Sequence, residues 1–178
     1  MATLKVPVTA SDHVLAAENA AVVLVEYGDY QCPHCAAAQG PVKQILLRYG
    51  GRVGLVFRHF PLTEVHPMAA PAAEAAEFAG DHGRFWEMHD AIYANQANLS
   101  PELLIALANA LHLSSHELRE ALVSGQHARK VQADFMGGVR SGVNGTPTFF
   151  VNGIRHDGGY SVPELAASIE NAMLAAAP

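Results

Sequence analysis

Cys32-Pro33-His34-Cys35 contains both cysteines of this 178-residue chain and lies between an apolar run and a stretch with helical periodicity. The spacing suits a reversible disulfide, because a disulfide requires Cα atoms about 4.4 to 6.8 Å apart and one helical turn opened by proline brings two cysteines within that reach. At a helix start, the Cys32 thiol would face unpaired backbone N–H groups and the positive end of the helix dipole, which lower a thiol pKa from about 8.5. We therefore predict that Cys32 is the nucleophile and Cys35 the resolving thiol.

The composition fits one domain over residues 1–178, with 50% hydrophobic residues and a formal net charge of -6. No cluster of Lys and Arg is present, which argues against nucleic acid or an anionic membrane surface as a partner. Residues 1–20 lack the apolar stretch of a signal peptide, and no segment reaches the roughly 20 apolar residues of a membrane span. We expect the chain as it stands to be cytoplasmic, and periplasmic if an export signal has been removed.

A reducing cytoplasm disfavours a permanent disulfide, so the Cys pair is interpreted as catalytic, redox-sensing or metal-binding. A single C-x-x-C motif without a second Cys pair argues against a structural metal site, and we expect no metal and no cofactor.

Two strands and a helix surround the Cys pair. The apolar run over 21–27 predicts a buried strand that ends at Gly28-Asp29, and 53–60 predicts a second one. Between them, apolar residues recur at helical spacing over 36–49 and stop at Gly50-Gly51. A strand, helix, strand unit predicts a parallel pair with the Cys pair at the first strand-to-helix junction.

The rest of the chain is mostly helical. The apolar spacing and the N-cap signals at Ser100 and Ser114 predict five helices, at 69–80, 84–95, 101–111, 115–124 and 126–140. A hairpin over 148–156 with a type I′ turn at Asn152-Gly153 and a closing helix over 162–175 follow. The whole pattern indicates an α/β fold.

Asn144-Gly145-Thr146-Pro147-Thr148 places a proline at the head of an apolar strand, where its missing N–H is tolerated and a cis bond is possible. With this motif, residues 21–175 resemble the DsbA-like thioredoxin-fold oxidoreductases. The stretches 25–31, 57–62 and 145–150 are similar to a soluble bacterial subgroup of thiol:disulfide oxidoreductases whose members are often exported.

The resemblance implies a thioredoxin fold, with a central mixed sheet flanked by helices, a core over about 21–62 and 143–176, and a helical insertion over about 63–142. It implies that Pro147 is cis and packs against the Cys pair, and that the backbone of Thr146 pairs with a substrate peptide. It also implies that Glu26 is a buried acid that exchanges protons with Cys35; the alternative is an exposed carboxylate at the strand end.

The histidine in the motif and those outside it are interpreted differently. His34 could donate a hydrogen bond or a positive charge to the Cys32 thiolate, and the alternative is a solvent-facing histidine. For five others we expect surface or capping roles: His59, His66, His82, His89 and His112. Four further side chains at helical spacing are expected to fill the core: Phe78, Phe85, Trp86 and Met88.

These observations favour a thiol:disulfide oxidoreductase that forms a mixed disulfide at Cys32 with protein or peptide substrates, resolved by Cys35, with Pro33 and His34 tuning the pair. The recycling partner is unknown, and a monomer is expected. One alternative is a non-catalytic redox sensor or binding module, against which Thr146-Pro147 argues. Another is a glutathione-dependent transferase or isomerase on a related fold, against which Cys35 argues.

Overall fold

The sheet is built on the apolar run that follows Ala21. The computed structural model describes residues 1–15 and 20–176, and in it β2 (Val22–Gly28) and β3 (Val53–His59) form a parallel pair in which Val22 lies opposite Val53. All of β3 and nearly all of β2 are buried. Both strands begin with apolar residues on both faces, because helices or chain segments cover both faces of the sheet there.

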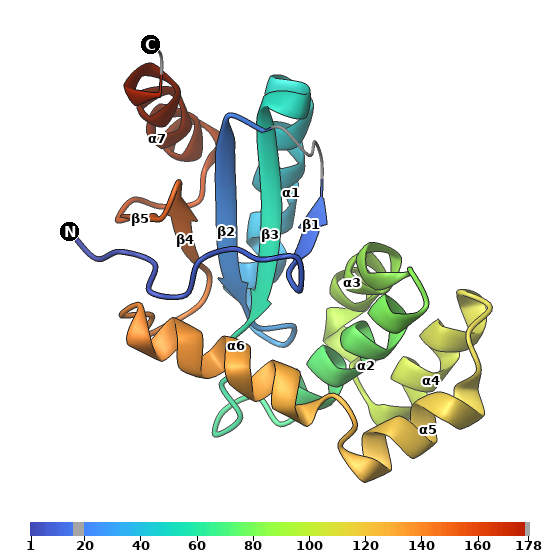
Figure 1. Cartoon of the computed structure of the whole chain (residues 1–178). Coiled ribbons are helices and arrows are strands. Elements are labelled where there is room, and N and C mark those ends of the chain that lie inside the picture. The colour runs from blue at the N-terminus through green and yellow to red at the C-terminus, as the bar shows by residue number, and fades with distance from the viewer. Residues whose placement is uncertain (16–19, 177–178) are drawn as a thin grey trace.

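Three short strands complete a mixed sheet in the order β1-β3-β2-β4-β5 (Figure 1). β4 (Thr148–Val151) is antiparallel to β2, and β5 (Ile154–His156) is antiparallel to β4. Asn152 and Gly153 both have positive φ (47° and 79°), as the predicted type I′ turn requires.

β1 (His13–Leu15) was not predicted. It pairs antiparallel with β3 at the edge of the sheet, and Val14 and Leu15 are exposed. Three residues at an exposed edge carry no apolar alternation that a sequence pattern would reveal.

The helices agree with the sequence pattern within a few residues. α1 (Pro33–Tyr49) and α7 (Val162–Ala175) pack on one face of the sheet around a core that includes Val42, Leu165 and Ile169. Inside the expected insertion lie α2 (Ala69–Asp81), α3 (Phe85–Ala94), α4 (Pro101–Ala110), α5 (Ser115–Ser124) and α6 (Ala128–Arg140). Two short 3-10 turns lie at Gly50–Arg52 and Gln96–Asn98.

The helix caps predicted at Ser100 and Ser114 are present in the structure. The side chains of Ser100 and Ser114 accept hydrogen bonds from the backbone N–H groups of Leu103 and Glu117. Figure 1 shows α2 to α5 gathered beside the sheet and α6 running back beneath the strand ends. None of the helices that the structure describes combines the length and apolar character needed to cross a bilayer.

The core extends from the sheet into the insertion. Tyr30, Cys32 and Cys35 belong to the same buried cluster as the insertion residues Phe78, Phe85 and Met88, while Trp86 is half-buried against it. The cysteine motif is therefore packed between the sheet and the helical insertion.

The N-terminal segment is fixed to the sheet by a buried arginine. Arg58 Nε and Nη2 donate to the two carboxylate oxygens of Asp12 (2.8 and 2.9 Å), and its guanidinium also donates to the carbonyls of Val6 and Pro7.

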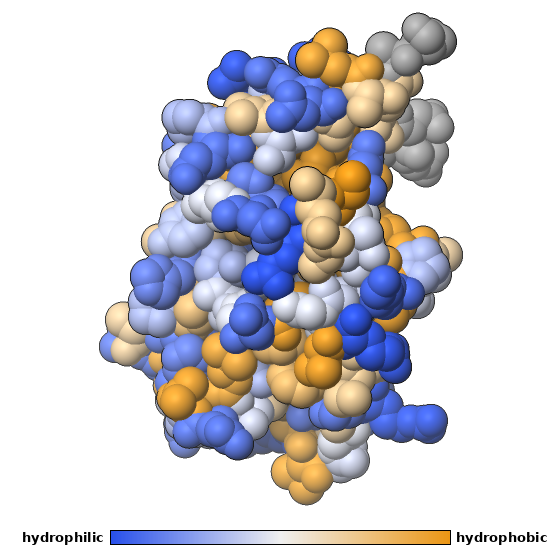
Figure 2. Space-filling view, turned by 90° about the vertical axis from the view of Figure 1, so that its left-hand side faces the viewer, coloured by the Kyte–Doolittle hydropathy of each residue, from blue (hydrophilic) through white to orange (hydrophobic). Residues whose placement is uncertain are grey.

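On the face nearest α7 and the N-terminus, Figure 2 shows small groups of hydrophobic residues separated by hydrophilic ones.

Two helical glycines give a matched test of the core packing. A Cβ on Gly138 in α6 would lie 2.7 Å from Phe60 Cδ2 and 3.0 Å from Tyr27 Cε1, whereas a Cβ on Gly40 in α1 would meet nothing within 4 Å. We expect Gly138→Ala to lower the free energy of unfolding by about 1 to 3 kcal/mol, because two core rings must shift. Gly40→Ala should raise it by about 0.5 to 1 kcal/mol. Guanidinium unfolding of both variants measures these changes. Equal changes in the free energy of unfolding would contradict the close contact between Gly138 and the two rings.

Candidate active site

The Cys pair lies at the N-terminal end of α1. Cys32 is the N-cap residue, with extended backbone angles (φ -75°, ψ 122°), and Pro33 opens the first turn. Both cysteines are free thiols. Cys32 is 5% exposed and Cys35 is fully buried, so an incoming disulfide or thiol can reach Cys32 and not Cys35.

The surroundings of Cys32 stabilise its thiolate. A hydrogen bond from Cys35, assisted by hydrogen bonds from the backbone N–H groups of Cys35 and His34, lowers the pKa of Cys32 to about 5. Donors aimed at a sulfur favour its charged form, and the helix N-terminus supplies two of them. Cys32 is therefore ionised at neutral pH.

Cys35 has the opposite character. Burial, followed by its hydrogen bond to Cys32 and the negative charge of Glu26, raises the pKa of the Cys35 thiol far above its ordinary range. The backbone N–H of Asp29 donates to Cys35 Sγ (3.4 Å). Cys35 thus keeps its proton until a base removes it.

The loop before β4 meets the Cys pair from the other side. Cys32 Sγ lies 3.4 Å from the carbonyl oxygen of Thr146, to which its protonated form donates, and the Thr146–Pro147 peptide bond is cis. Residues 114 positions apart in the chain therefore form one site.

Asp29 is a central residue of this site that the sequence analysis treated only as part of a turn. It is 1% exposed, and its Oδ1 accepts from the backbone N–H groups of Gln31 (2.7 Å) and Cys32 (3.1 Å). Its Oδ2 accepts from the backbone N–H of Leu62 (2.8 Å) and lies 2.8 Å from His66 Nδ1. The signal available in the sequence was an aspartate three residues before a helix N-cap.

Glu26 is buried, as the resemblance implied, rather than exposed at the strand end. Its side chain is fully enclosed, and burial raises the pKa of Glu26 to about 8. A carboxyl group with a pKa near neutrality is able to give and take protons at physiological pH. Glu26 therefore has the protonation behaviour that proton exchange with Cys35 requires.

His34 is placed differently from the first expectation. Its side chain is exposed and its Nδ1 lies 3.0 Å from the hydroxyl of Tyr160, so the hydrogen bond from the imidazole to Cys32 is not formed in this structure. What His34 gives to Cys32 is its backbone N–H. Tyr160 follows the hairpin and had no signal in the sequence.

Two histidines that were expected at the surface are buried, so that expectation was wrong for His59 (1% exposed) and His89 (2%). Each is buried at low cost because it has polar partners within the fold. His59 Nε2 lies 2.7 Å from Glu77, and His89 bonds to Tyr30 and Gln39. His82 does bond to a carbonyl of the last turn of α2, which agrees with the capping role.

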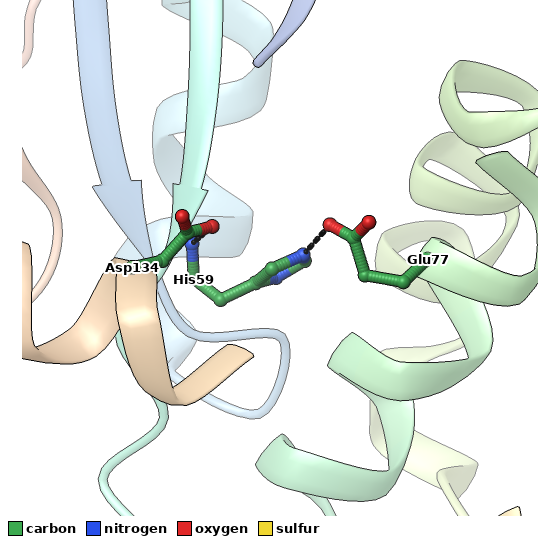
Figure 3. A group of neighbouring side chains, drawn as sticks. All are labelled: His59, Glu77 and Asp134. Atoms are coloured by element: carbon green, nitrogen blue, oxygen red, sulfur yellow. Dashed lines mark hydrogen bonds and ion pairs between the residues drawn. The ribbon is translucent and has the colours of Figure 1, made fainter. Parts of the chain in front are cut away.

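His59, Glu77 and Asp134 form the one group of metal-ligating side chains found in the described part of the chain, and Figure 3 shows His59 between the two carboxylates. Glu77 is already paired with His59 and with His13, whose Nε2 lies 2.9 Å away. Asp134 is paired with Lys130 (2.6 Å). Both carboxylates are therefore already engaged by side chains of the fold, and within this group only His59 Nδ1 is without a partner.

A family model described as "Thioredoxin" matches residues 9–171. The chain belongs to the thioredoxin family. The fold is also that of several solved structures. BdbD from Bacillus subtilis in its oxidised form has a TM-score of 0.87 at 24% identity, over 97% of this chain and 98% of that one. Alpha-DsbA1 from Wolbachia pipientis has a TM-score of 0.83 at 20% identity, over 97% and 96%. These likenesses establish the DsbA-like thioredoxin fold.

Curated relatives with higher identity carry a different name. The chain is 46% identical, over 95% of its length, to the Na⁺/H⁺ antiporter NhaA 1 of Salinispora arenicola, and 44% identical, over 97%, to the Na⁺/H⁺ antiporter NhaA 3 of Salinispora tropica. It spans 26% of the length of each of these relatives. The likeness therefore concerns a thioredoxin-like segment of a longer protein.

The low pKa of Cys32 predicts fast alkylation of the reduced protein well below pH 7. We expect the rate of modification by iodoacetamide to rise with pH around a midpoint near 5, with Cys35 unmodified in the folded protein. Cys35→Ala removes the largest stabilising hydrogen bond, so the midpoint should move upward. Mass spectrometry of the modified peptides gives both results, and a midpoint above 8 in the unmodified chain would contradict the geometry.

The raised pKa of Glu26 predicts a pH-dependent stability. The folded state keeps the proton until pH about 8, while an unfolded glutamate loses it near 4.5, so the unfolded state is favoured increasingly between these values. In the oxidised protein Cys32 does not titrate, and the free energy of unfolding should fall by about 3 to 5 kcal/mol between pH 4.5 and 8. Glu26→Gln should abolish this fall. Guanidinium unfolding of both proteins across this range measures it, and parallel curves would show that Glu26 titrates normally.

Proposed function

We propose that this chain is a thiol:disulfide oxidoreductase for protein or peptide substrates. The observation that carries the proposal is the contrast within the Cys pair: Cys32 at the helix end is 5% exposed and has a pKa of about 5, whereas Cys35 is fully buried and its pKa is raised. A thiolate that is nucleophilic at neutral pH, next to a resolving thiol, is the equipment of disulfide exchange. Membership of the thioredoxin family and the DsbA-like fold support this function.

The exchange proceeds through a mixed disulfide at Cys32. When the chain acts as a reductant, the Cys32 thiolate forms a bond to one sulfur of the substrate disulfide, and the other sulfur leaves with the electron pair. Cys35 then loses its proton and attacks Cys32 Sγ, which closes the Cys32–Cys35 disulfide and releases the second substrate thiolate. When it acts as an oxidant, the same steps run in reverse, with a substrate thiolate attacking Cys32.

The low pKa of Cys32 favours the oxidant direction. A thiolate that is stabilised in the reduced form makes the dithiol more stable relative to the disulfide, and so raises the reduction potential. In this proposal Thr146 and Pro147 form the substrate-binding edge, because Thr146 already meets Cys32 through its backbone carbonyl. An extended peptide would lie along the same backbone.

The site argues against the two alternatives. A redox sensor needs a pair that opens and closes, but it has no need of a nucleophile with a pKa near 5 or of a backbone edge beside it. A glutathione-dependent transferase has no use for the resolving thiol that Cys35 supplies. Turnover of a dithiol substrate without glutathione separates both from the proposed function.

A second candidate concerns the partner. Similarity above 40% to part of two proteins named Na⁺/H⁺ antiporters favours a role in the thiol chemistry of such an antiporter. We therefore propose an antiporter with accessible cysteines as one protein substrate of Cys32. The location of the chain follows that of this partner, either at the cytoplasmic side of the membrane or, for an exported form, at the periplasmic side.

Trapping the mixed disulfide tests the function and both assignments. Cys35→Ala should accumulate a covalent adduct with a peptide disulfide that is lost on reduction, because nothing resolves the Cys32 bond. Cys32→Ala should form no adduct. Adducts are counted by mass spectrometry, and an antiporter preparation replaces the peptide to test the second candidate.

Either of two outcomes would overturn these roles. Adducts formed by Cys32→Ala and not by Cys35→Ala would reverse the nucleophile and the resolving thiol. No adduct and no disulfide exchange by the unmodified chain would remove the proposed function itself.

A further inference from the structure

The carboxyl group of Glu26 has two different oxygens. Oε1 accepts a hydrogen bond from Gln39 Nε2 at 3.4 Å, whereas Oε2 is buried and has no partner. Glu26 itself is 0% exposed. One oxygen is therefore held in place, and the other is free to carry the proton.

The orientation of the Gln39 amide follows from its neighbours. Its nitrogen faces two oxygens, Glu26 Oε1 and the Cys35 carbonyl at 3.3 Å, and only an N–H group can bond to both. Its oxygen consequently faces His89 Nε2, at 3.0 Å. The amide thus connects Glu26 on β2 with His89 on α3, and it also contacts the backbone of the resolving cysteine.

The same reasoning fixes His89. Because Gln39 Oε1 can only accept, His89 Nε2 carries the hydrogen, and His89 Nδ1 accepts from the hydroxyl of Tyr30 at 3.0 Å. Burial lowers the pKa of His89 to about 3, so the ring is neutral and keeps this tautomer. The hydrogen bonds therefore run in one direction, from Tyr30 through His89 and Gln39 to Glu26.

The titratable groups around Glu26 leave Gln39 as the residue that stabilises its charge. Burial first, and to a lesser extent the negative charge of Glu26, raise the pKa values of Cys35 on α1, of Tyr30 in the loop before α1 and of Tyr93 on α3. All three are neutral at physiological pH, and so is His89. The donor that favours the carboxylate over the acid is thus the Gln39 amide.

We propose that Gln39, oriented by His89, is a positioning residue that sets how readily the Glu26 carboxylate takes the proton of Cys35 during resolution. The inference deepens the proposed function and rests on it. In this step the Cys35 proton passes to Glu26, the Cys35 sulfur forms its bond with Cys32, and the bond from Cys32 to the substrate sulfur breaks. The electron pair leaves with the substrate thiolate.

The direction of the effect follows from charge stabilisation. Without the Gln39 donor the carboxylate is less stable, so the pKa of Glu26 rises further above 8 and a smaller fraction is ionised at pH 7. Resolution should become slower, while the attack by Cys32, which uses a different set of donors, should not change. His89 acts through Gln39, so its loss should have the same sign and a smaller size.

The test separates the two steps with an aromatic disulfide that releases a coloured thiolate at each step. In stopped flow, the first release reports attack by Cys32 and the second, which is independent of reagent concentration, reports resolution by Cys35. We expect Gln39→Leu to slow the second release about three- to tenfold at pH 7 and to move its pH midpoint upward, with the first release unchanged. His89→Leu should give a smaller shift, and His89→Gln, which keeps an N–H donor, should restore the rate.

Matched controls distinguish positioning from a loss of structure. Gln44→Leu, at an exposed position of the same helix, should change neither release. In a Glu26→Gln background, Gln39→Leu should change the second release less than about twofold, because the group that it positions is absent. Circular dichroism and thermal unfolding show that each variant is folded, and Gln39→Met is a second variant should Gln39→Leu not fold.

Two results would overturn the inference: an unchanged pH midpoint in Gln39→Leu, or an equal slowing by Gln39→Leu in the presence and absence of Glu26. These differ from failure of the proposed function, in which the unmodified chain itself would show no second release.

Discussion

The unequal solvation of two thiols one helical turn apart is the constraint on which the rest of this molecule depends. Cys32 occupies the N-cap position, where its sulfur meets backbone donors, while Cys35 lies on the inner face of α1 and is fully buried. The helix geometry enforces this difference, because residues three positions apart share a face but only the first lies at the helix end. One thiol is consequently charged and the other neutral at the same pH.

Asp29 connects the backbone at Cys32 to the start of the helical insertion. One oxygen of its buried carboxylate holds the backbone before α1, and the other holds Leu62 and His66, at the start of the insertion. Charge-assisted hydrogen bonds of this kind are stronger than neutral ones and fix geometry more tightly. The same side chain therefore holds both the backbone of Cys32 and the start of the insertion.

The sequence was sufficient where the signal was local. The Cys motif, the parallel strands, the hairpin turn at Asn152-Gly153 and the helices capped by Ser100 and Ser114 depend on short-range patterns, and each is present. It was insufficient where function depends on contacts between distant residues. Nothing in the neighbours of Gln39 indicates that its partners are Glu26, 13 residues away, and His89, 50 residues away. His59 and His89 were misplaced for the same reason, because a histidine is buried only when a remote partner satisfies it.

The burial of Glu26 has a free-energy cost if the carboxyl group is ionised, and it also raises the pKa that makes proton exchange possible. An ionised carboxylate at that position would be destabilising, since the described surroundings offer it one amide donor and no cation at hydrogen-bonding distance. Keeping the proton up to pH about 8 avoids that cost at neutral pH, and it leaves a proton that can be exchanged beside Cys35. The amide of Gln39 is weak enough to preserve the raised pKa and still orients the group, whereas a lysine in its place would lower the pKa and abolish the exchange. The neutrality of this network is therefore what makes Glu26 useful to the thiol chemistry.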